Sequence, residues 1–330
     1  MSTSSEVEVL LATFNGDRFL REQIESILRQ DYENIRVLAR DDGSTDCTVG
    51  ILTEFAARFP SRFQILPSTF PGGSAKDNFL RLMEASTADY ICFSDQDDVW
   101  LPHKVSKTKQ AMELLESTWG ADVPLLVFTD LQLVDEKLNL LHRSFWAKMR
   151  IDPAGMDSFT RLMVRSVVTG STTMINRRLL ELSRRMPKEA SMHDRWTALV
   201  ASAMGKFSFV RKPTVLYRQH DRNVLGTGQK RQTRSMLQRI LRPTVAQKHL
   251  MQWRASQRQA AALLRVHGAE LPAEKRDIVE AYLRCEANRN PLVRVATFIR
   301  HGFFYDGFLP NLLTIFHLWN TGRDEQEVGS

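Results

Sequence analysis

The sequence predicts an α/β protein whose mostly parallel sheet is wrapped by helices, followed by a helical C-terminal region. In the N-terminal half, short apolar runs of strand length alternate with longer segments whose apolar residues recur at helical spacing. Three of the short runs end in acidic or polar loops, and open α/β sheets bind their ligands outside the carboxyl ends of their strands. The chain of 330 residues can hold one large domain and a smaller one.

The elements of the N-terminal half follow one another in strict alternation. The first strand is recognised by Val7, Val9 and Leu11, which alternate with other residues before a polar loop. The expected strands are residues 7–11, 35–39, 63–66 and 90–94, and the expected helices have their apolar faces at 19–28, 51–59, 79–83 and 102–115. Parallel strands joined in this way place the loops that follow them at one edge of the sheet.

The pattern loosens after residue 125. Short strands interleave with helices there, as in a mixed second half-sheet, and we expect them at residues 125–128, 172–175, 207–210 and 214–217. Past Gly228 the chain becomes helical and basic. The sequence therefore predicts a first domain over residues 1–226, with halves at about 1–100 and 101–226, and a C-terminal region over 227–330.

Composition indicates an ordinary globular protein with an anionic partner. The chain is 43% hydrophobic and 25% charged, with a formal net charge of +7. Three cysteines far apart in sequence favour a reducing compartment over a disulfide framework. The first residues lack the basic and apolar segments of an export signal, and no uncharged stretch reaches the roughly 20 residues that span a bilayer. We therefore expect a cytoplasmic protein.

The most informative stretch is residues 90–100, Tyr-Ile-Cys-Phe-Ser-Asp-Gln-Asp-Asp-Val-Trp. An apolar run that reads as a buried strand ends there in Asp95, Asp97 and Asp98. Carboxylates this close repel one another unless a positive charge lies among them, and a hard divalent cation at Asp95 and Asp97 could in turn bind a diphosphate. The alternative is a solvated acidic loop that caps the next helix.

Two common phosphate-binding motifs are missing from the sequence. No Gly-x-Gly-x-x-Gly follows the first strand, which argues against a dinucleotide-dependent oxidoreductase. No Gly-x-x-x-x-Gly-Lys-Ser/Thr occurs either, which argues against an ATP-type phosphate loop.

Five ordered motifs resemble those of family 2 glycosyltransferases. They are Ala-Thr-Phe-Asn-Gly at 12–16, Asp-Asp-Gly-Ser-Thr-Asp at 41–46, Ser-Asp-Gln-Asp-Asp-Val-Trp at 94–100, His-Asp-Arg-Trp at 193–196 and Leu-Tyr-Arg-Gln-His at 216–220. The resemblance covers roughly the first two-thirds of the chain. It implies the GT-A fold, inverting transfer and a nucleotide-diphosphate-sugar donor, with the donor bound by the half at 1–100 and the acceptor by the half at 101–226.

The resemblance implies that Asp194 is the catalytic base. In an inverting transfer, an acceptor hydroxyl attacks the anomeric carbon from the face opposite the departing diphosphate, so the hydroxyl needs a general base. Asp194 precedes an apolar helix that would hold it rigidly. Its alternative role is that of a carboxylate capping that helix.

The resemblance also implies a metal and nucleotide site. Asp97 is the expected direct ligand of Mg²⁺ or Mn²⁺, Asp95 contacts the ribose or metal-bound water, and His220 binds the metal or the diphosphate. Asp42 is expected to accept a hydrogen bond from a pyrimidine imide. All the expected donor contacts come from Thr13, Asn15, Asp42, Lys76, Asn78, Asp95 and Arg218.

Structural roles remain open for several of these residues. Asp41 and Asp42 could merely serve the turn at Gly43, and Arg218 could pair with a surface acid instead of the leaving group. A lone histidine such as His220 is often structural. On the acceptor side the resemblance implicates Gly170, whose small size lets a sugar approach the backbone, together with His193 and Trp196.

The sequence departs from the family pattern at two places. Where related sequences commonly carry Ala-Arg-Asn, this chain has Lys76-Asp77-Asn78, so Lys76 would replace a phosphate-facing arginine less bidentately. After His220 the family pattern has glycine but this chain has Asp221. The second departure leaves the conformation of that loop open.

The C-terminal region is basic and then aromatic. No acidic residue lies between Asp221 and Glu270, an interval with ten arginines and lysines, and the segment 295–319 is rich in apolar and aromatic residues. This suits peripheral contact with an anionic membrane, where each basic residue is attracted by ~1 kcal/mol. The alternative is a solvated helix face beside helices packed on the catalytic domain. Nucleic acid is not expected, because no recognition fold is evident.

The resemblance narrows the reaction further. The motifs are similar to those of bacterial rhamnosyltransferases of cell-surface polysaccharide assembly, such as O-antigen or capsule. They favour dTDP-L-rhamnose as donor, then a UDP-hexose, with a glycan or lipid-diphosphate-linked acceptor at the inner face of the membrane. Two other classes remain open at this stage: a non-catalytic glycan- or lipid-binding module and a sugar nucleotidyltransferase.

Overall fold

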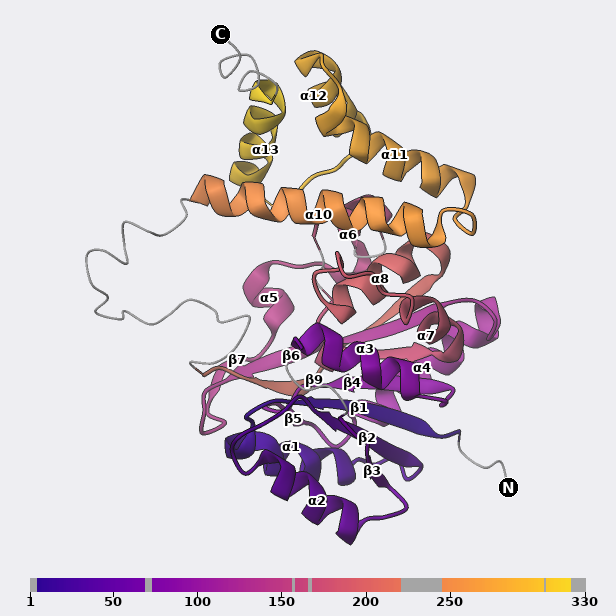
Figure 1. Ribbon diagram of the computed structural model, residues 1–330, viewed down its shortest axis with the longest axis vertical. Helices are drawn as coiled ribbons and strands as arrows, with labels where there is room; N and C mark the ends of the chain where they lie inside the picture. The colour runs from indigo at the N-terminus through magenta and orange to yellow at the C-terminus, as the bar shows by residue number, and fades with distance from the viewer. Residues whose placement is uncertain are drawn as a thin grey trace, which may run out of the picture. The chain divides into compact units, whose positions relative to one another are not determined.

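The computed structural model describes residues 5–68, 73–155, 158–165, 168–220, 245–305 and 307–321 (Figure 1). The chain divides into two compact units. We call them the sheet unit (Met1–Asp157, Val167–Met186 and Met192–Gly226) and the helical unit (Ser158–Ser166, Pro187–Ser191 and Thr227–Ser330). The boundary expected between residues 226 and 227 lies outside the described residues.

The N-terminal half has the predicted alternation of strands and helices. Its elements are β1 (Val7–Thr13), α1 (Asp17–Leu28), β2 (Ile35–Asp41), α2 (Thr48–Arg58), β3 (Phe63–Ile65), α3 (Ala75–Ala85) and β4 (Tyr90–Ser94). The four strands are adjacent in the order β3-β2-β1-β4, and all their pairings are parallel. The predicted α/β class is therefore confirmed for this half.

The second half of the sheet unit extends the sheet with mixed strands. Its elements are β5 (Val99–Trp100), α4 (Lys104–Trp119), β6 (Leu125–Val134), β7 (Leu140–His142), α5 (Phe145–Met149), β8 (Thr173–Asn176), α7 (Arg177–Ser183), α8 (His193–Met204) and β9 (Lys206–Arg218). Within the described residues the sheet has nine strands in the order β3-β2-β1-β4-β8-β6-β9-β5, with β7 paired to β6. The short strand β5 follows β4 in sequence but stands at the far end of this order.

One expectation about the strands was wrong. The two strands predicted at 207–210 and 214–217 form a single strand, β9. Its pairing with β6 shifts register opposite Thr129 and Asp130, where Pro213 interrupts the ladder. Proline cannot donate to a sheet ladder, so the chain bulges there and continues as one strand.

Each face of the sheet is covered by helices. On one face, Val9 of β1 belongs to an apolar core with Ile24 of α1, Phe55 of α2 and Met112 of α4. On the other face, the ring of Phe93 in β4 meets Phe79 of α3 edge-on, with centroids 5.8 Å apart. Side chains alternate between the two faces of a strand. The strands that lead to the loops are therefore packed against helices on both faces of the sheet.

The helical unit confirms the predicted helical C-terminal region. It contains α6 (Phe159–Val164), α10 (Val245–His267), α11 (Ala273–Ala287), α12 (Pro291–Arg300) and α13 (Phe308–Asn320). Of the predicted basic run, Lys248, Arg254, Arg258 and Arg265 lie on α10, whereas the basic residues at 222–242 lie outside the described residues. None of the helices described here combines the length and apolar character needed to cross a membrane.

Candidate active site

The three acidic and polar loops meet at one edge of the sheet. Thr13 at the end of β1 is in register with Asp41 at the end of β2, and Leu11 of β1 is in register with Ser94 at the end of β4. The strands are parallel, so their carboxyl ends open on the same side. The strand register thus brings the three loops together, as the sequence predicted.

Asp41 organises the turn after β2. Its carboxylate accepts hydrogen bonds from the Thr13 hydroxyl (2.9 Å), the Ser44 hydroxyl (2.6 Å) and the N–H groups of Gly43 and Ser44. Gly43 has a φ of 89°, which favours glycine. The turn-serving role left open for the Asp41–Asp42 pair therefore describes Asp41.

Asn15 ties the first loop to the second. Its side-chain oxygen accepts from the Thr45 N–H at 2.9 Å, and its own N–H donates to the Ser44 hydroxyl at 2.8 Å. Its φ of 48° lies in the left-handed region, which asparagine tolerates better than most residues. Asn15 and Thr13 thus shape the loops predicted to hold a nucleotide, and direct contact with the ligand stays a prediction.

Asp42 makes a different set of contacts, through an arginine that the sequence did not single out. Its carboxylate lies 3.3 Å from the Arg40 guanidinium, and both side chains are buried. Arg40 also donates to the Asn78 side-chain oxygen at 2.9 Å. Asn78 in turn donates to the carbonyls of Thr13 and Arg40. Asn78 therefore links the ends of β1 and β2 by hydrogen bonds, and Arg40 holds the Asp42 carboxylate.

Lys76 lies in the first turn of α3, whose start is held by a capping box. The Ser74 hydroxyl accepts from the Asp77 N–H while the Asp77 carboxylate accepts from the Ser74 N–H. The neighbouring Gly73 lies close to Asp42, because a Cβ built on it would be 3.7 Å from the Asp42 carboxylate. The N-terminus of α3 therefore stands beside the predicted nucleotide pocket, and phosphate binding by Lys76 stays a prediction.

Residues 95–98 carry the chain from the middle of the sheet to its end. They join β4 to β5, and β5 pairs with β9 through Val99–Leu216 and Trp100–Val215. This pairing brings the end of β9 to the acidic loop: the Arg218 N–H donates to the Asp98 carboxylate, and the Arg218 side chain donates to the Asp97 carbonyl at 2.9 Å. Two motifs 120 residues apart thus form one structure.

Asp97 and His220, two of the predicted metal ligands, are in direct contact. The Asp97 carboxylate lies 2.8 Å from the His220 ring nitrogen Nε2, and the Asp97 side chain is 19% exposed. Within the described ranges, no three histidine, cysteine or acidic side chains form a ready metal cage. Mg²⁺ is usually bound by one or two carboxylates together with water and substrate phosphates. Asp97 matches that kind of ligand, and metal binding by Asp97 and His220 stays a prediction. Asp95 is not a third preformed ligand.

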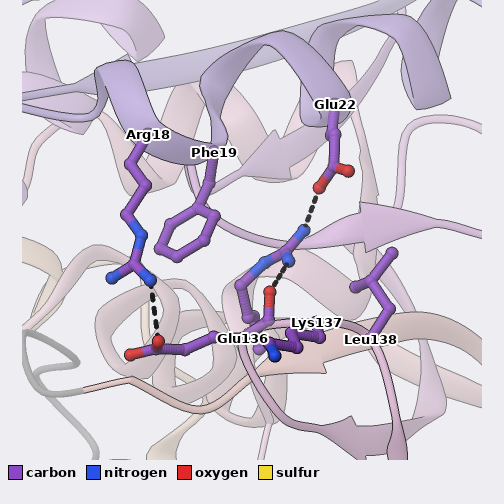
Figure 2. A pocket seen from close by; sticks show the side chains of 7 residues that line it. Arg18, Phe19, Glu22, Glu136, Lys137 and Leu138 are labelled. Carbon is purple, nitrogen blue, oxygen red and sulfur yellow. Dashed lines mark hydrogen bonds and ion pairs between the residues drawn. The ribbon is translucent and has the colours of Figure 1, made fainter.

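The Arg218 guanidinium is engaged on several sides. It donates to the Glu136 carbonyl at 2.6 Å and to the Glu22 carboxylate at 2.5 Å, and it lies over the Phe19 ring. The acid-pairing role left open from the sequence matches these contacts. Figure 2 shows Glu22 and Glu136 in a pocket of about 250 Å³. Arg218 is the one predicted site residue among its lining residues, which are Arg18, Phe19, Glu22, Glu136, Lys137, Leu138 and Arg218.

The acidic loop is crowded with negative charge. Burial, followed by the charges of Asp97 and Asp194, raises the pKa of Asp95 to about 7. Burial and the charges of Asp97 and Asp95 also raise the pKa of Asp98 well above its ordinary range. The interaction with Asp194 places α8 near the loop after β4, so the predicted base and the predicted metal loop share one neighbourhood.

Asp194 is held by two backbone N–H groups. Its carboxylate accepts from the Gly170 N–H at 3.0 Å and from the Arg195 N–H at 2.6 Å. Burial raises the pKa of Asp194, and these two hydrogen bonds offset part of the rise. Helix α8 begins at His193, so Asp194 is inside its first turn and its other oxygen reaches a different loop. This is more than the helix-capping role considered from the sequence.

Gly170 and His193 pack tightly behind Asp194. A Cβ on Gly170 would lie 2.8 Å from His193 Nε2, so no larger residue fits there without movement. The His193 ring stacks on Phe79 with centroids 3.7 Å apart, and neither ring nitrogen has a hydrogen-bond partner among the described residues. Burial lowers the pKa of His193 to about 3, so the ring is neutral. Trp196 is also fully buried and donates to the Ser183 carbonyl.

Comparison with known protein families gives the class of this protein. The family model "Glycosyl transferase family 2" matches residues 8–181, which is more than half of the chain. The chain belongs to the family 2 glycosyltransferases, and it is an enzyme with the GT-A fold.

The chain is similar to two curated proteins and to one solved structure. The chain is 31% identical over 228 residues to the dTDP-rhamnosyl transferase RfbG of Shigella flexneri, covering 66% of this chain and 73% of that one. It is 31% identical over 99 residues to WfgD of Escherichia coli, named a UDP-Glc:α-D-GlcNAc-diphosphoundecaprenol β-1,3-glucosyltransferase (30% and 38% covered). The S. aureus TarS 1–349 structure matches with a TM-score of 0.59 at 14% identity (98% and 92% covered), and TarS 1–349 has also been solved with UDP-GlcNAc.

Proposed function

We propose that this chain transfers a sugar with inversion from a nucleotide-diphosphate donor to an acceptor hydroxyl, with Asp194 as the general base. The observation that carries the proposal is a carboxylate with a raised pKa, held by two N–H groups, close to the acidic loop after β4. An inverting displacement needs a base on one side of the anomeric carbon and charge neutralisation on the other. This arrangement supports both requirements.

Asp194 would take the proton of the acceptor hydroxyl. As the acceptor oxygen bonds to the anomeric carbon, the bond from that carbon to the diphosphate breaks and the proton passes to the carboxylate. The Gly170 and Arg195 N–H groups use one lone pair on each oxygen, which leaves other lone pairs for the incoming proton. Partial burial raises the basicity of Asp194, which favours this role.

Asp97 and His220 would hold a divalent cation, Mg²⁺ or Mn²⁺, together with the donor phosphates. Family 2 enzymes often use such a metal. When bound, the cation neutralises the charge that develops on the departing nucleotide. Asp95 would contact the ribose or a metal-bound water, and Arg218 supports the site by holding the Asp97 carbonyl.

The donor base would lie between the first two loops. Asp42, paired with Arg40, would accept the imide N–H of a pyrimidine, which both thymidine and uridine nucleotides present. Similarity to RfbG favours dTDP-L-rhamnose as the donor. The name of WfgD supports a UDP-hexose as the alternative.

The acceptor would be a glycan or a lipid-diphosphate-linked oligosaccharide of cell-surface polysaccharide assembly, O-antigen or capsule. Gly170, which touches Asp194 and His193, would face the acceptor, while the buried His193 and Trp196 would act by packing. An acceptor of this kind would place the enzyme in the cytoplasm, at the inner face of the membrane.

A donor screen tests the proposal. The purified chain is offered a panel of nucleotide-sugars with Mg²⁺ or Mn²⁺, and thermal stabilisation, nucleotide release and the anomeric configuration of the product are measured. We expect one pyrimidine nucleotide-sugar to stabilise and turn over with inversion. An Asp42→Ala variant should lose the stabilisation. Turnover with retained configuration, or no response to any nucleotide-sugar, would contradict the proposal.

A further inference from the structure

The last two described helices, α12 and α13, carry exposed apolar side chains. On α13 the exposed residues follow one another at helical spacing, and we call them the α13 stripe: Phe308, Leu312, Phe316 and Trp319. Phe308 is 82% exposed and Phe316 68% exposed. At 100° per residue, positions 308, 312, 316 and 319 share one face of the helix.

A different face of the same helices packs inside the helical unit. On α13, Thr314 and Leu318 are buried, and the Thr314 hydroxyl bonds to His249 of α10 at 2.7 Å. On α12, Phe298 is fully buried against Trp253. The apolar residues expected from the sequence to form faces at 295–319 therefore divide into a packed set and an exposed set. The exposed set is not the inner side of this bundle.

Arg294 fixes the pair of helices. Its buried guanidinium donates to the carbonyls of Leu318, Trp319 and Thr321 at the end of α13 and to that of Asn288 before α12. These carbonyls would otherwise lack partners at the helix end. The α13 stripe thus lies on a helix of 13 residues, about 20 Å long, whose C-terminal end is held by Arg294. A helix of this length can lie along a surface.

Helices α12 and α13 contain basic residues and no acidic ones. Arg289, just before α12, and Arg300, at its end, are exposed, and Glu286 of α11 pairs with His317 of α13. A second copy docked symmetrically on this face would bring the arginines of both copies together. An anionic lipid surface would pair with them and accept the aromatic side chains, as interfacial amphipathic helices do.

We propose that the α13 stripe, flanked by Arg289 and Arg300, is a docking surface for an anionic lipid bilayer. The biological role of this docking surface rests on the proposed function, since a lipid-linked acceptor would be presented at a bilayer. Its occupant is the bilayer interface, because the helix is too short to cross the hydrocarbon.

Vesicle co-sedimentation of the full chain tests this inference. The chain is mixed with phosphatidylcholine vesicles and with vesicles that also contain phosphatidylglycerol, at low and high salt. We expect binding to the anionic vesicles that weakens with salt. Phe308→Ser combined with Phe316→Ser should reduce partitioning at least about tenfold. The matched control removes two exposed apolar side chains elsewhere, Leu114→Ser with Met251→Ser, and should bind like the parent chain.

Arg289→Gln with Arg300→Gln provides a second variant that leaves the packed face untouched. We expect about a fivefold loss for each arginine, confined to anionic vesicles. Failure of the parent chain to bind, or equal binding by the stripe variant and the control, would overturn the inference. So would a dimer without vesicles that the stripe variant abolishes, because the second copy would then be the occupant.

Donor hydrolysis measured in solution separates this inference from the proposed function. If the chain hydrolyses the donor but does not bind vesicles, only the docking surface is refuted. A chain that binds vesicles through the stripe but processes no nucleotide-sugar refutes only the transfer reaction.

Discussion

Replacing Asp194 by asparagine removes the proposed base while keeping its size. General base catalysis is typically worth 10²–10⁴-fold in rate, so kcat for sugar transfer should fall by about that factor, or roughly 3–5 kcal/mol of barrier. The structure adds a second expectation. Both carboxylate oxygens accept N–H groups, from Gly170 and Arg195, so the amide NH₂ must face one of these donors. That mismatch should cost about 1–3 kcal/mol of folding stability.

The assay is steady-state transfer with the donor found by screening, combined with thermal unfolding. Donor binding should be nearly unchanged, because the hydrogen bonds of Asp194 go to Gly170 and Arg195 and not to a predicted donor residue. Asp122→Asn, an exposed aspartate in the same unit, is the matched control and should behave like the parent chain. In the parent chain kcat should fall as the pH drops through the raised pKa of Asp194, and this acid limb should vanish in the variant. Near-normal turnover by Asp194→Asn would refute the role.

Three further predictions follow from the same contacts. Gly170→Ala would place a methyl group 2.8 Å from His193 Nε2, so kcat should fall by up to about 10²-fold at unchanged donor KM; an unchanged kcat would argue against Gly170 as a positioning residue. Arg40→Lys should raise the donor KM about 5–30-fold, by loosening Asp42; a change in kcat alone would contradict this. Below pH 6.5 His193 is protonated in the unfolded chain, but in the folded chain only near pH 3. The free energy of unfolding should therefore fall by up to about 1.4 kcal/mol for each unit by which the pH is lowered in this range, and His193→Asn should flatten that slope.

The sheet edge could be predicted from the sequence because it depends on local patterns. Each strand near the site is a short apolar run followed by a polar loop, and parallel strands necessarily bring such loops together. The positions of Asp42, Asp95 and Asp97 at one edge follow from this rule. The residue types in each loop then indicated the chemistry.

The contacts between distant segments could not be predicted in this way. Arg40 is one residue within a strand, and nothing in its neighbours indicates that it reaches Asp42 and Asn78. The bond from Gly170 to Asp194 depends on how α8 packs against a loop 24 residues earlier. The engagement of Arg218 by Glu22 depends on β5 pairing with β9, which places the end of the sheet beside α1.

The central claim is that Asp97 anchors a divalent cation which draws off charge as the nucleotide leaves. The most direct test is sugar transfer measured after thorough chelation, then with Mg²⁺ or Mn²⁺ returned, for the parent chain and for Asp97→Asn. We expect activity to disappear in chelator, to return with the metal in the parent chain, and not to return in the variant. Full transfer by the metal-stripped parent chain would contradict the claim.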